Sequence, residues 1–173
     1  HSESMKVTAL MFGLDLENVS LTLPRLPCEG ETDSIAALAE YCRDCFADYD
    51  SERMKRLIKK KIQLREIYII SHKDKTVGFV IFSKKNKTLD YIAVSPDYRN
   101  SGIASRLMVT AMAQFDIGDE LSIVTFRDDP PQSDGAKRLY GKFGFGNPKN
   151  IVVQGVPLTK ITAIIPDKAL TTE

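Results

Sequence analysis

A strand end, a tight turn and the start of a helix follow one another within residues 94–108. Pro96 lacks an N–H and suits the exit of a strand, while the short polar side chains after it favour turns and helix caps. Beyond Gly102, apolar residues recur at steps of three and four, which predicts an amphipathic helix that begins at the turn. These residues are Ala104, Leu107, Met108, Ala111 and Phe115. Strand-to-helix turns of this kind are common in α/β domains, and this is the fold class that we expect.

The first backbone N–H groups of the predicted helix have no carbonyl partner inside it and carry the positive end of its dipole. Gly102 lets a ligand approach the main chain, and Arg99 adds a full positive charge beside the same opening. We therefore expect the turn to bind a phosphate or pyrophosphate. On these residues alone, a plain helix cap by Asn100 or Ser101 is an equally good interpretation.

The overall composition limits the number of domains and the kinds of partner. The 173 residues are enough for one compact core and too few for two comfortable domains, so we expect a single domain over residues 5–173. We interpret residues 1–4, which precede Met5, as a cloning remnant. The 24 basic residues balance the 23 acidic ones, which argues against nucleic acid or an acidic membrane as a partner. The longest apolar runs are shorter than the ~20 residues needed to span a bilayer, so we expect a cytoplasmic protein.

The three cysteines are Cys28, Cys42 and Cys45, and the last two have the C-x-x-C spacing of a redox pair or half a zinc site. Both also fit the apolar stripe of the first predicted helix, where a free cysteine behaves as a small buried hydrophobe. A second pair of metal ligands is missing, because His72 is the only histidine beyond residues 1–4. We favour the core interpretation and expect no metal.

Two amphipathic helices are predicted in the first half of the chain. The first covers residues 34–47, after two weak strands at residues 6–12 and 19–23. The second begins after Asp50 and Ser51, which can cap it. Its apolar face consists of Met54, Leu57, Ile58 and Ile62. We expect its many lysines and arginines on the opposite, solvated face.

The second half of the chain is β-rich, because beyond Leu64 the hydrophobic period shortens toward two. Strands at residues 66–71, 76–83 and 88–94 are separated by short polar turns and should pair antiparallel. After the turn and its helix come a strand at 121–126, a helix at 133–143 and a last strand region at 151–165. A strand joined through a helix to the next strand usually makes a parallel crossover. We therefore expect a mixed, mostly antiparallel twisted sheet flanked by about four helices.

Residues 99–104 read R-N-S-G-I-A, and residues 136–145 read A-K-R-L-Y-G-K-F-G-F. The first segment resembles the Q/R-x-x-G-x-G/A signature, and the second the A-x-x-L-Y-x-x-x-G-F segment, of the GNAT superfamily of acetyl-CoA-dependent N-acetyltransferases. The resemblance covers residues 88–146 well. It implies a GNAT-like fold that uses acetyl-CoA as a cosubstrate.

By this resemblance, the backbone amides of residues 100–104 hold the coenzyme pyrophosphate, and the main chain near Val94 pairs with the pantetheine arm like a further strand. The implied coenzyme-binding residues are Ile92, Ala93, Val94, Arg99, Asn100, Ser101, Gly102, Ile103, Ala104, Ser105 and Ser133. Two positions depart from the commoner family pattern. Ala104 stands where many relatives have glycine, and Ser133 stands where many have an asparagine that contacts the pantetheine arm.

Two residues are candidates for proton transfer. Tyr140 matches the family's tyrosine and could protonate the departing thiolate, although it also fits a helical stripe as a core aromatic. Asp90 shares strand parity with Ile92 and Val94, so we expect all three to face the same side of the sheet. There Asp90 could take the amine proton directly or through a chain of water, or serve only as a surface carboxylate.

The function that these observations favour is N-acetyl transfer from acetyl-CoA to a primary amine, by direct attack in a ternary complex. A non-catalytic acyl-CoA-binding or interaction module is the alternative. Another enzyme of phosphorylated ligands is disfavoured, because Gly102 belongs to no G-x-G-x-x-G or G-x-x-x-x-G-K-[ST] pattern. The acceptor could be a small amine or an amine of a peptide or protein, and a second copy of the chain is a further candidate partner.

Overall fold

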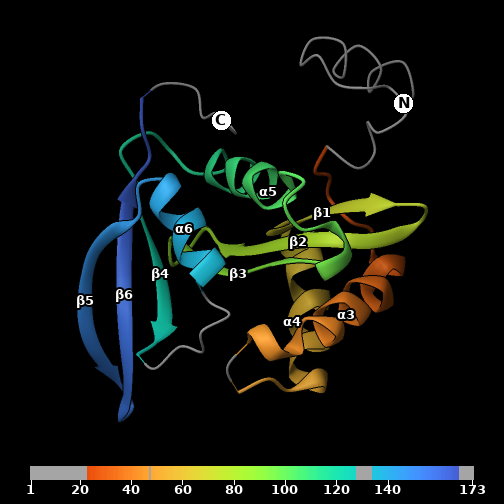
Figure 1. Cartoon of the computed structure of the whole chain (residues 1–173), viewed down its shortest axis with the longest axis horizontal. Coiled ribbons are helices and arrows are strands. Elements are labelled where there is room, and N and C mark those ends of the chain that lie inside the picture. The colour runs from red at the N-terminus through yellow and green to blue at the C-terminus, as the bar shows by residue number, and fades with distance from the viewer. Residues whose placement is uncertain (1–22, 47, 128–133, 168–173) are drawn as a thin grey trace.

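A single six-stranded sheet forms the centre of the described part of the protein (Figure 1). The computed structural model describes residues 23–46, 48–127 and 134–167. The strand order is β1-β2-β3-β4-β6-β5, and all neighbours pair antiparallel except β3 and β4, which are parallel. The strands are β1 Ile67–His72, β2 Lys75–Ser83, β3 Thr88–Val94, β4 Glu120–Phe126, β5 Gly146–Val153 and β6 Val156–Ile164. The mixed, mostly antiparallel sheet predicted from the sequence is confirmed.

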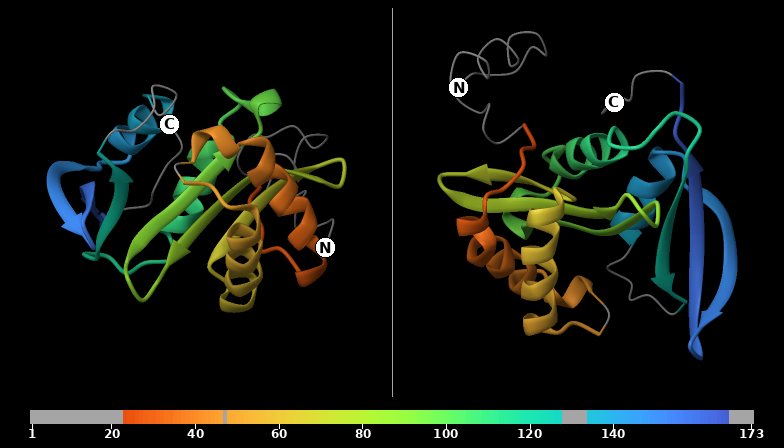
Figure 2. Two further views of the ribbon diagram at one scale, coloured as in Figure 1. Left: turned by 90° about the horizontal axis from the view of Figure 1, so that it is seen from below. Right: turned by 180° about the vertical axis from the view of Figure 1, so that it is seen from behind.

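Four α-helices flank the sheet within the described residues, two on each side (Figures 1 and 2). Helices α3 and α4 cover one face of β1–β3, while α5 and α6 lie on the other face. The α-helices are α3 Thr32–Tyr41, α4 Ser51–Leu64, α5 Ile103–Met112 and α6 Asp134–Lys142. Three short 3₁₀ turns accompany them, namely η2 Glu29–Glu31, η3 Arg43–Cys45 and η4 Pro96–Tyr98. No helix in these parts of the chain is long and apolar enough to cross a membrane.

The sheet separates two hydrophobic cores, because successive side chains of a strand point to opposite faces. The core under α5 takes its side chains from strands β1–β4 and β6 and from the helix itself, with Leu107 and Met108 almost completely buried. The core under α3 and α4 is built around Ile35, Ile58 and Phe79, each of them fully buried. The helices are therefore fixed to the sheet on both sides of β3, which is the strand that leads into the predicted ligand turn.

Strands β3 and β4 diverge immediately after they meet. Their pairing register contains one pair only, Thr88 with Ser122, and the Ser122 N–H donates to the Lys87 carbonyl at 2.9 Å. Beyond this point β4 turns away with β6 and β5, so that the two halves of the sheet stand at a steep angle in Figure 1. The edge of β3 that faces β4 is consequently left open toward its carboxyl end.

Helix α4 follows the sequence prediction closely at both ends. The Asp50 carboxylate caps it by accepting a hydrogen bond from the Arg53 N–H at 2.8 Å, and Arg65 ends it in the left-handed conformation. Met54 and Ile58 of the predicted apolar face are buried. One basic residue contradicts the prediction, because Lys61 is only 6% exposed and does not lie on the solvated face.

The helix predicted over residues 34–47 is shorter than expected. Helix α3 ends at Tyr41, and the chain then tightens into η3 before it becomes extended at Phe46. The change of direction at Cys42 takes the following residues off the apolar stripe. Cys42 is buried as predicted, whereas the prediction of a buried Cys45 is wrong, because that residue is exposed.

The single strand region predicted at residues 151–165 is a hairpin. Strands β5 and β6 are joined by Gln154 and Gly155, whose φ angles are 49° and 80°. Two successive residues with positive φ make the two-residue turn that matches the twist of paired strands. The sequence prediction missed this turn because Gln-Gly is a weaker turn signal than Asn-Gly or Asp-Gly.

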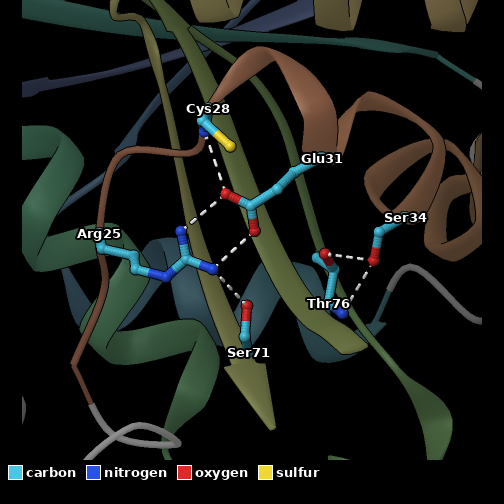
Figure 3. A network of polar contacts seen from close by, with 6 residues as sticks. All are labelled: Arg25, Cys28, Glu31, Ser34, Ser71 and Thr76. Atoms are coloured by element: carbon cyan, nitrogen blue, oxygen red, sulfur yellow. Dashed lines mark hydrogen bonds and ion pairs between the residues drawn. The ribbon is translucent and has the colours of Figure 1, made fainter. Parts of the chain in front are cut away.

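The segment before α3 is tied to the edge strand β1 by a polar network (Figure 3). Arg25 pairs with Ile69 in an isolated β-bridge, and its guanidinium makes two hydrogen bonds to the Glu31 carboxylate, at 2.8 and 2.6 Å. The same guanidinium donates to the Ser71 hydroxyl at 3.1 Å, and the Cys28 N–H donates to Glu31 at 3.0 Å. These bonds lower the pKa of Glu31 to about 2. The weak strands predicted at residues 6–12 and 19–23 lie outside the described residues, apart from Leu23.

Candidate functional site

The predicted ligand turn connects β3 to α5 through η4. Ser95 caps η4 by accepting a hydrogen bond from the Asp97 N–H at 3.4 Å, and the Ser101 hydroxyl donates to the Tyr98 carbonyl. The Tyr98 hydroxyl lies 2.7 Å from Nδ1 of His72, at the end of β1. Hydrogen bonds within the turn and one to the His72 side chain of β1 therefore hold the turn in place before helix α5 begins.

Gly102 occupies the residue just before α5 and has a φ of 82°. This left-handed conformation is strained for residues with a Cβ, which explains the choice of glycine. A Cβ built on Gly102 would meet nothing within 4 Å, so the space above the backbone is open. The Arg106 N–H is already bonded to the Gly102 carbonyl at 3.1 Å, whereas the N–H groups before it have no partner inside the helix. The structure thus presents bare amides at an open helix start, as an anion requires.

Two cationic side chains flank this helix start. Arg99 lies along the end of β3, where its Nε donates to the Val94 carbonyl at 3.4 Å. Lys142, at the end of α6, places its Nζ 3.2 Å from the Ser105 hydroxyl in the first turn of α5. The contribution of Arg99 was predictable from the sequence, whereas that of Lys142 was not predicted. The only signal for Lys142 was its place in the segment that resembles the GNAT family.

The helix start is held close to the sheet by a glycine on the neighbouring strand. Gly78 of β2 lies opposite Val94 and beneath α5, where a Cβ would come within 2.8 Å of Ile103 Cγ2 and 3.0 Å of Leu107 Cδ1. Glycine is therefore required at this position by close packing. The packing sets how near the first amides of α5 come to the end of β3.

The open edge of β3 presents backbone groups toward β4. The Ser95 N–H bonds to the Val77 carbonyl of β2 at 2.8 Å, so in the antiparallel alternation the N–H and C=O groups of Val94 and Ile92 point the other way. Within the described chain, the pairing of β3 with β4 does not extend to these residues. An extended ligand arm could pair here as a further strand would.

Asp90 does not face the side of the sheet that its parity predicted. The register of β2 and β3 shifts at this point, because Ile81 is opposite Tyr91 while Phe82 is opposite Leu89. Asp90 is the extra residue of a β-bulge, which interrupts the alternation of side chains. As a result Leu89 joins the core under α5, whereas Asp90 contacts α4 on the opposite face. The prediction that Asp90 shares a side with Ile92 and Val94 is wrong.

A buried ion pair lies behind the bulge. The Lys61 ammonium donates to Glu66 Oε1 at 3.0 Å and to the Phe82 carbonyl at 2.6 Å, and lies 3.8 Å from Asp90 Oδ2. Burial raises the pKa of Asp90, against the opposing effects of the Thr88 hydroxyl, which donates to it at 2.7 Å, and of Lys61. Asp90 keeps 32% of its side-chain surface exposed. It is therefore a carboxylate with a raised pKa that solvent can still reach.

A small pocket lies on the same face of the sheet as Asp90. Its walls come from the segment before α4, from α4 itself and from Tyr91, the residue that follows Asp90 in β3. Phe46 and Tyr49 line it together with Tyr91, and Asp48 and Asp50 add carboxylates. Arg53 also lines the pocket and lies 4.0 Å from the Asp48 carboxylate, so the pocket combines aromatic surface with two carboxylates and one guanidinium.

The remaining predicted residues are placed as follows. Tyr140 lies on α6, half-buried against the core under α5, with its ring 6.2 Å from that of Phe145 in an edge-to-face contact. Ser133 lies outside the described residues. No group of three or more potential metal ligands occurs in the described ranges.

Comparison with known proteins identifies the architecture. Residues 63–146 match the family described as "Acetyltransferase (GNAT) domain", while no curated protein matches the chain significantly. Among solved structures, a GNAT-family acetyltransferase from Bacillus cereus has a TM-score of 0.63 at 17% identity, over 82% of this chain and 95% of its own. Ard1 from Thermoplasma volcanium has a TM-score of 0.64 at 17% identity, over 83% and 97%. The structure of yncA from Salmonella typhimurium with its cofactor acetyl-CoA has a TM-score of 0.59 at 12% identity, over 86% and 96%.

At these identities the solved structures show the shared fold, and the family match supplies the class. The two central strands of the mixed sheet diverge beside an open helix start. Together with the family match, this arrangement defines an acyltransferase. Residues 63–146 thus match the GNAT acetyltransferase domain, and the described part of the chain shares its fold with GNAT-family acetyltransferases.

Proposed function

We propose that the protein transfers the acetyl group of acetyl-CoA to a primary amine, by direct attack of the amine within a ternary complex. The observation that carries this proposal is the open edge of β3 directly beside the bare amides at the start of α5. A diphosphate and an extended amide-containing arm are the two parts of coenzyme A that such a pair of features fits. The known cofactor of yncA, a protein of the same fold, supports this choice.

The pyrophosphate end of the coenzyme would bind at the turn. The backbone amides of residues 100–104 would donate hydrogen bonds to its oxygens, and the αL conformation of Gly102 leaves the room that the phosphate groups need. Arg99 and Lys142 would add charge from the two sides, and Ser105 lies next to Lys142. Ala104, in the first turn of α5, is only half-buried.

The pantetheine arm would run along β3 toward the point where β3 and β4 meet. Ile92 and Val94 would pair with its amides through the backbone groups that β4 leaves unbonded. Coenzyme A carries the acetyl group as a thioester, whose carbonyl is activated toward an amine nucleophile. A backbone N–H of β3 near Val94 would stabilise the developing negative charge on that carbonyl oxygen.

The acceptor side would lie on the face that carries Asp90 and the aromatic pocket. Asp90 would take a proton from the amine, directly or through water, and its raised pKa suits a base better than an ordinary aspartate would. Phe46, Tyr49 and Tyr91 would contact apolar parts of the acceptor, while the carboxylates of Asp48 and Asp50 would attract a cationic amine. Tyr140 would donate the proton that the departing thiolate needs.

A non-catalytic acyl-CoA-binding module is the second candidate. One observation favours it, namely that the Asp90 carboxylate is already engaged by the Thr88 hydroxyl and by Lys61. A carboxylate that only stabilises the bulge would have the same contacts. The module would bind the coenzyme with the same turn and strand edge but release no thiol.

One pair of measurements separates the two candidates. Release of coenzyme A thiol from acetyl-CoA is followed across a panel of small amines and peptides, with an acceptor-free blank that corrects for the protein's own cysteines. Binding of coenzyme A is measured in parallel by calorimetry. Binding with acceptor-dependent thiol release supports the enzyme, and binding without release from any acceptor supports the module. Absence of coenzyme binding would contradict both.

A further inference from the structure

Two thiols that the proposed reaction does not use meet Arg99 at the end of β3. Cys42, which is only 3% exposed, directs its Sγ toward the Val94 carbonyl at 3.7 Å. Cys45 is exposed, and its Sγ accepts a hydrogen bond from Arg99 Nη2 at 3.7 Å. The same guanidinium also donates to the Val94 carbonyl. One cation therefore joins the thiol pair to the strand edge.

The local backbone brings the two cysteines to a spacing that a disulfide can bridge. They are three residues apart and connected by η3, in which the Cys45 N–H donates to the Cys42 carbonyl at 2.9 Å. A 3₁₀ turn places residues i and i+3 on the same side, with their Cα atoms about 6 Å apart along the axis. Disulfides span Cα separations of roughly 4.4–6.8 Å. The Cα spacing that this turn sets is therefore within the range of a disulfide.

The surroundings give the two thiols unequal reactivity. Burial raises the pKa of the Cys42 thiol, as does the neighbouring Cys45, while Arg99 opposes this shift. Cys45 is the accessible thiol, and its sulfur lies beside the Arg99 guanidinium. Cys45 is thus suited to react first with an external reagent, and Cys42 to react second with Cys45.

We propose that Cys42 and Cys45 form a reversible disulfide, which makes the end of β3 an oxidation-sensitive site whose co-reactant is a low-molecular-weight disulfide. The Cys45 thiolate attacks one sulfur of that disulfide, forms a mixed disulfide and releases one thiolate. The Cys42 thiolate then attacks Cys45 Sγ and displaces the second thiolate. The two protons lost by the cysteines are taken up by the two released thiolates, so two protein thiols are oxidised and one external disulfide is reduced.

The disulfide would change how Arg99 is held. The sulfur of Cys45 that accepts from the guanidinium becomes bonded to Cys42, and Cys42 loses the S–H that faces the Val94 carbonyl. Arg99 is also a residue of the proposed coenzyme site, and this consequence alone rests on the proposed function. Bound coenzyme A should draw Arg99 away from Cys45 and slow oxidation of the pair.

The chain offers a sharp test by mass spectrometry. Trypsin cleaves after Arg43, between the two cysteines, so a Cys42–Cys45 disulfide would hold two peptides together. Cys28 lies on the same tryptic peptide as Cys42, so the experiment uses the full chain with Cys28→Ser, a change at an exposed position. The protein is treated with glutathione disulfide, alkylated and digested. We expect the linked peptides, their loss on reduction with dithiothreitol, and their absence when Cys45→Ser is added.

Arg99→Gln provides the second arm, with each variant's fold checked by circular dichroism. Loss of the neighbouring cation should slow the reaction of Cys45 roughly threefold to tenfold, while the reaction of Cys28 in the chain with native Cys28 is unchanged. The proposal is overturned if no linked peptides form, if only a mixed disulfide accumulates on Cys45, or if Arg99→Gln leaves the rate unaltered. Coenzyme binding by the reduced protein tests the proposed function separately, because disulfide formation does not depend on it.

Discussion

Replacement of Gly78 by alanine tests whether the close packing of α5 on β2 sets the geometry of the anion site. The added Cβ would lie 2.8 Å from Ile103 Cγ2 and 3.0 Å from Leu107 Cδ1. Carbon atoms prefer separations of about 3.5 Å or more, so the side chains or the helix must yield by about 0.7 Å. Overpacking of this kind costs about 1–3 kcal/mol of stability. Ile103 is the first residue of α5, so a shift there moves the amides that would bind the pyrophosphate.

The assays are chemical denaturation for stability and calorimetry for coenzyme A binding. We expect Gly78→Ala to lower the free energy of unfolding by about 1–3 kcal/mol and to weaken binding about tenfold, which corresponds to about 1.4 kcal/mol. Gly30→Ala is the matched control, because a Cβ at Gly30 meets nothing within 4 Å and lies far from α5 in the sequence. If Gly78→Ala is as stable as the control, the packing argument is refuted. A destabilised variant with unchanged affinity would show that the start of α5 does not bind the coenzyme.

The other predictions concern proton transfer and two ion pairs. Tyr140→Phe should lower kcat about a hundredfold while calorimetry gives an unchanged coenzyme affinity, and an unaltered kcat would exclude the phenol from the mechanism. Wild-type kcat should fall as the pH drops through the raised pKa of Asp90. Asp90→Asn should lower kcat and abolish this fall at acidic pH. A variant with the wild-type pH profile would rule out Asp90 as the base. The lowered pKa of Glu31 contributes stability above the unfolded pKa near 4.5 that is lost as the pH falls toward 2, about 1–2 kcal/mol after solvent screening. Glu31→Gln should abolish this part of the stability–pH curve, measured by denaturation, and an identical curve would contradict the assignment. Lys61→Met should lower the free energy of unfolding by about 3–5 kcal/mol, because it leaves the buried Glu66 carboxylate without its cation. Adding Glu66→Gln should recover part of this loss. Additive effects of the two substitutions would refute the pairing.

The elements that a periodic pattern specifies could be predicted from the sequence. The strands at residues 66–71, 76–83 and 88–94 agree with β1–β3 to within a residue or two, and Asp50 caps α4 as expected. In these segments the local propensity and the burial pattern agree, so nothing in the tertiary structure overrides them. The turn at Gly102 also follows from local rules, because its positive φ and its position before an amphipathic helix are both sequence signals.

The features that depend on contacts between distant segments could not be predicted. The bulge at Asp90 is a property of the pairing between β2 and β3. It places Asp90, the candidate base, on the opposite face of the sheet from the one predicted. Lys61 was assigned to solvent because a lysine on a basic helix usually lies there, whereas Glu66 and the Phe82 carbonyl satisfy its buried charge. Cys45 was predicted to be buried because it continues the apolar stripe of the first helix, but that helix ends at Tyr41. Each error arose where a single residue's partner lies elsewhere in the fold.

The divergence of β3 and β4 also bears on which molecules can reach the open edge of β3. A strand with unbonded N–H and C=O groups is the surface through which sheets of different molecules join, and most proteins place such a strand at the outside of a sheet, where it must be protected. Here the groups that no neighbouring strand pairs with belong to a central strand, flanked by β2 on one side and by the departing β4 on the other. A foreign sheet edge could reach them only by entering between two strands of the same molecule. The position of β3 inside the sheet thus closes this strand edge to another polypeptide sheet.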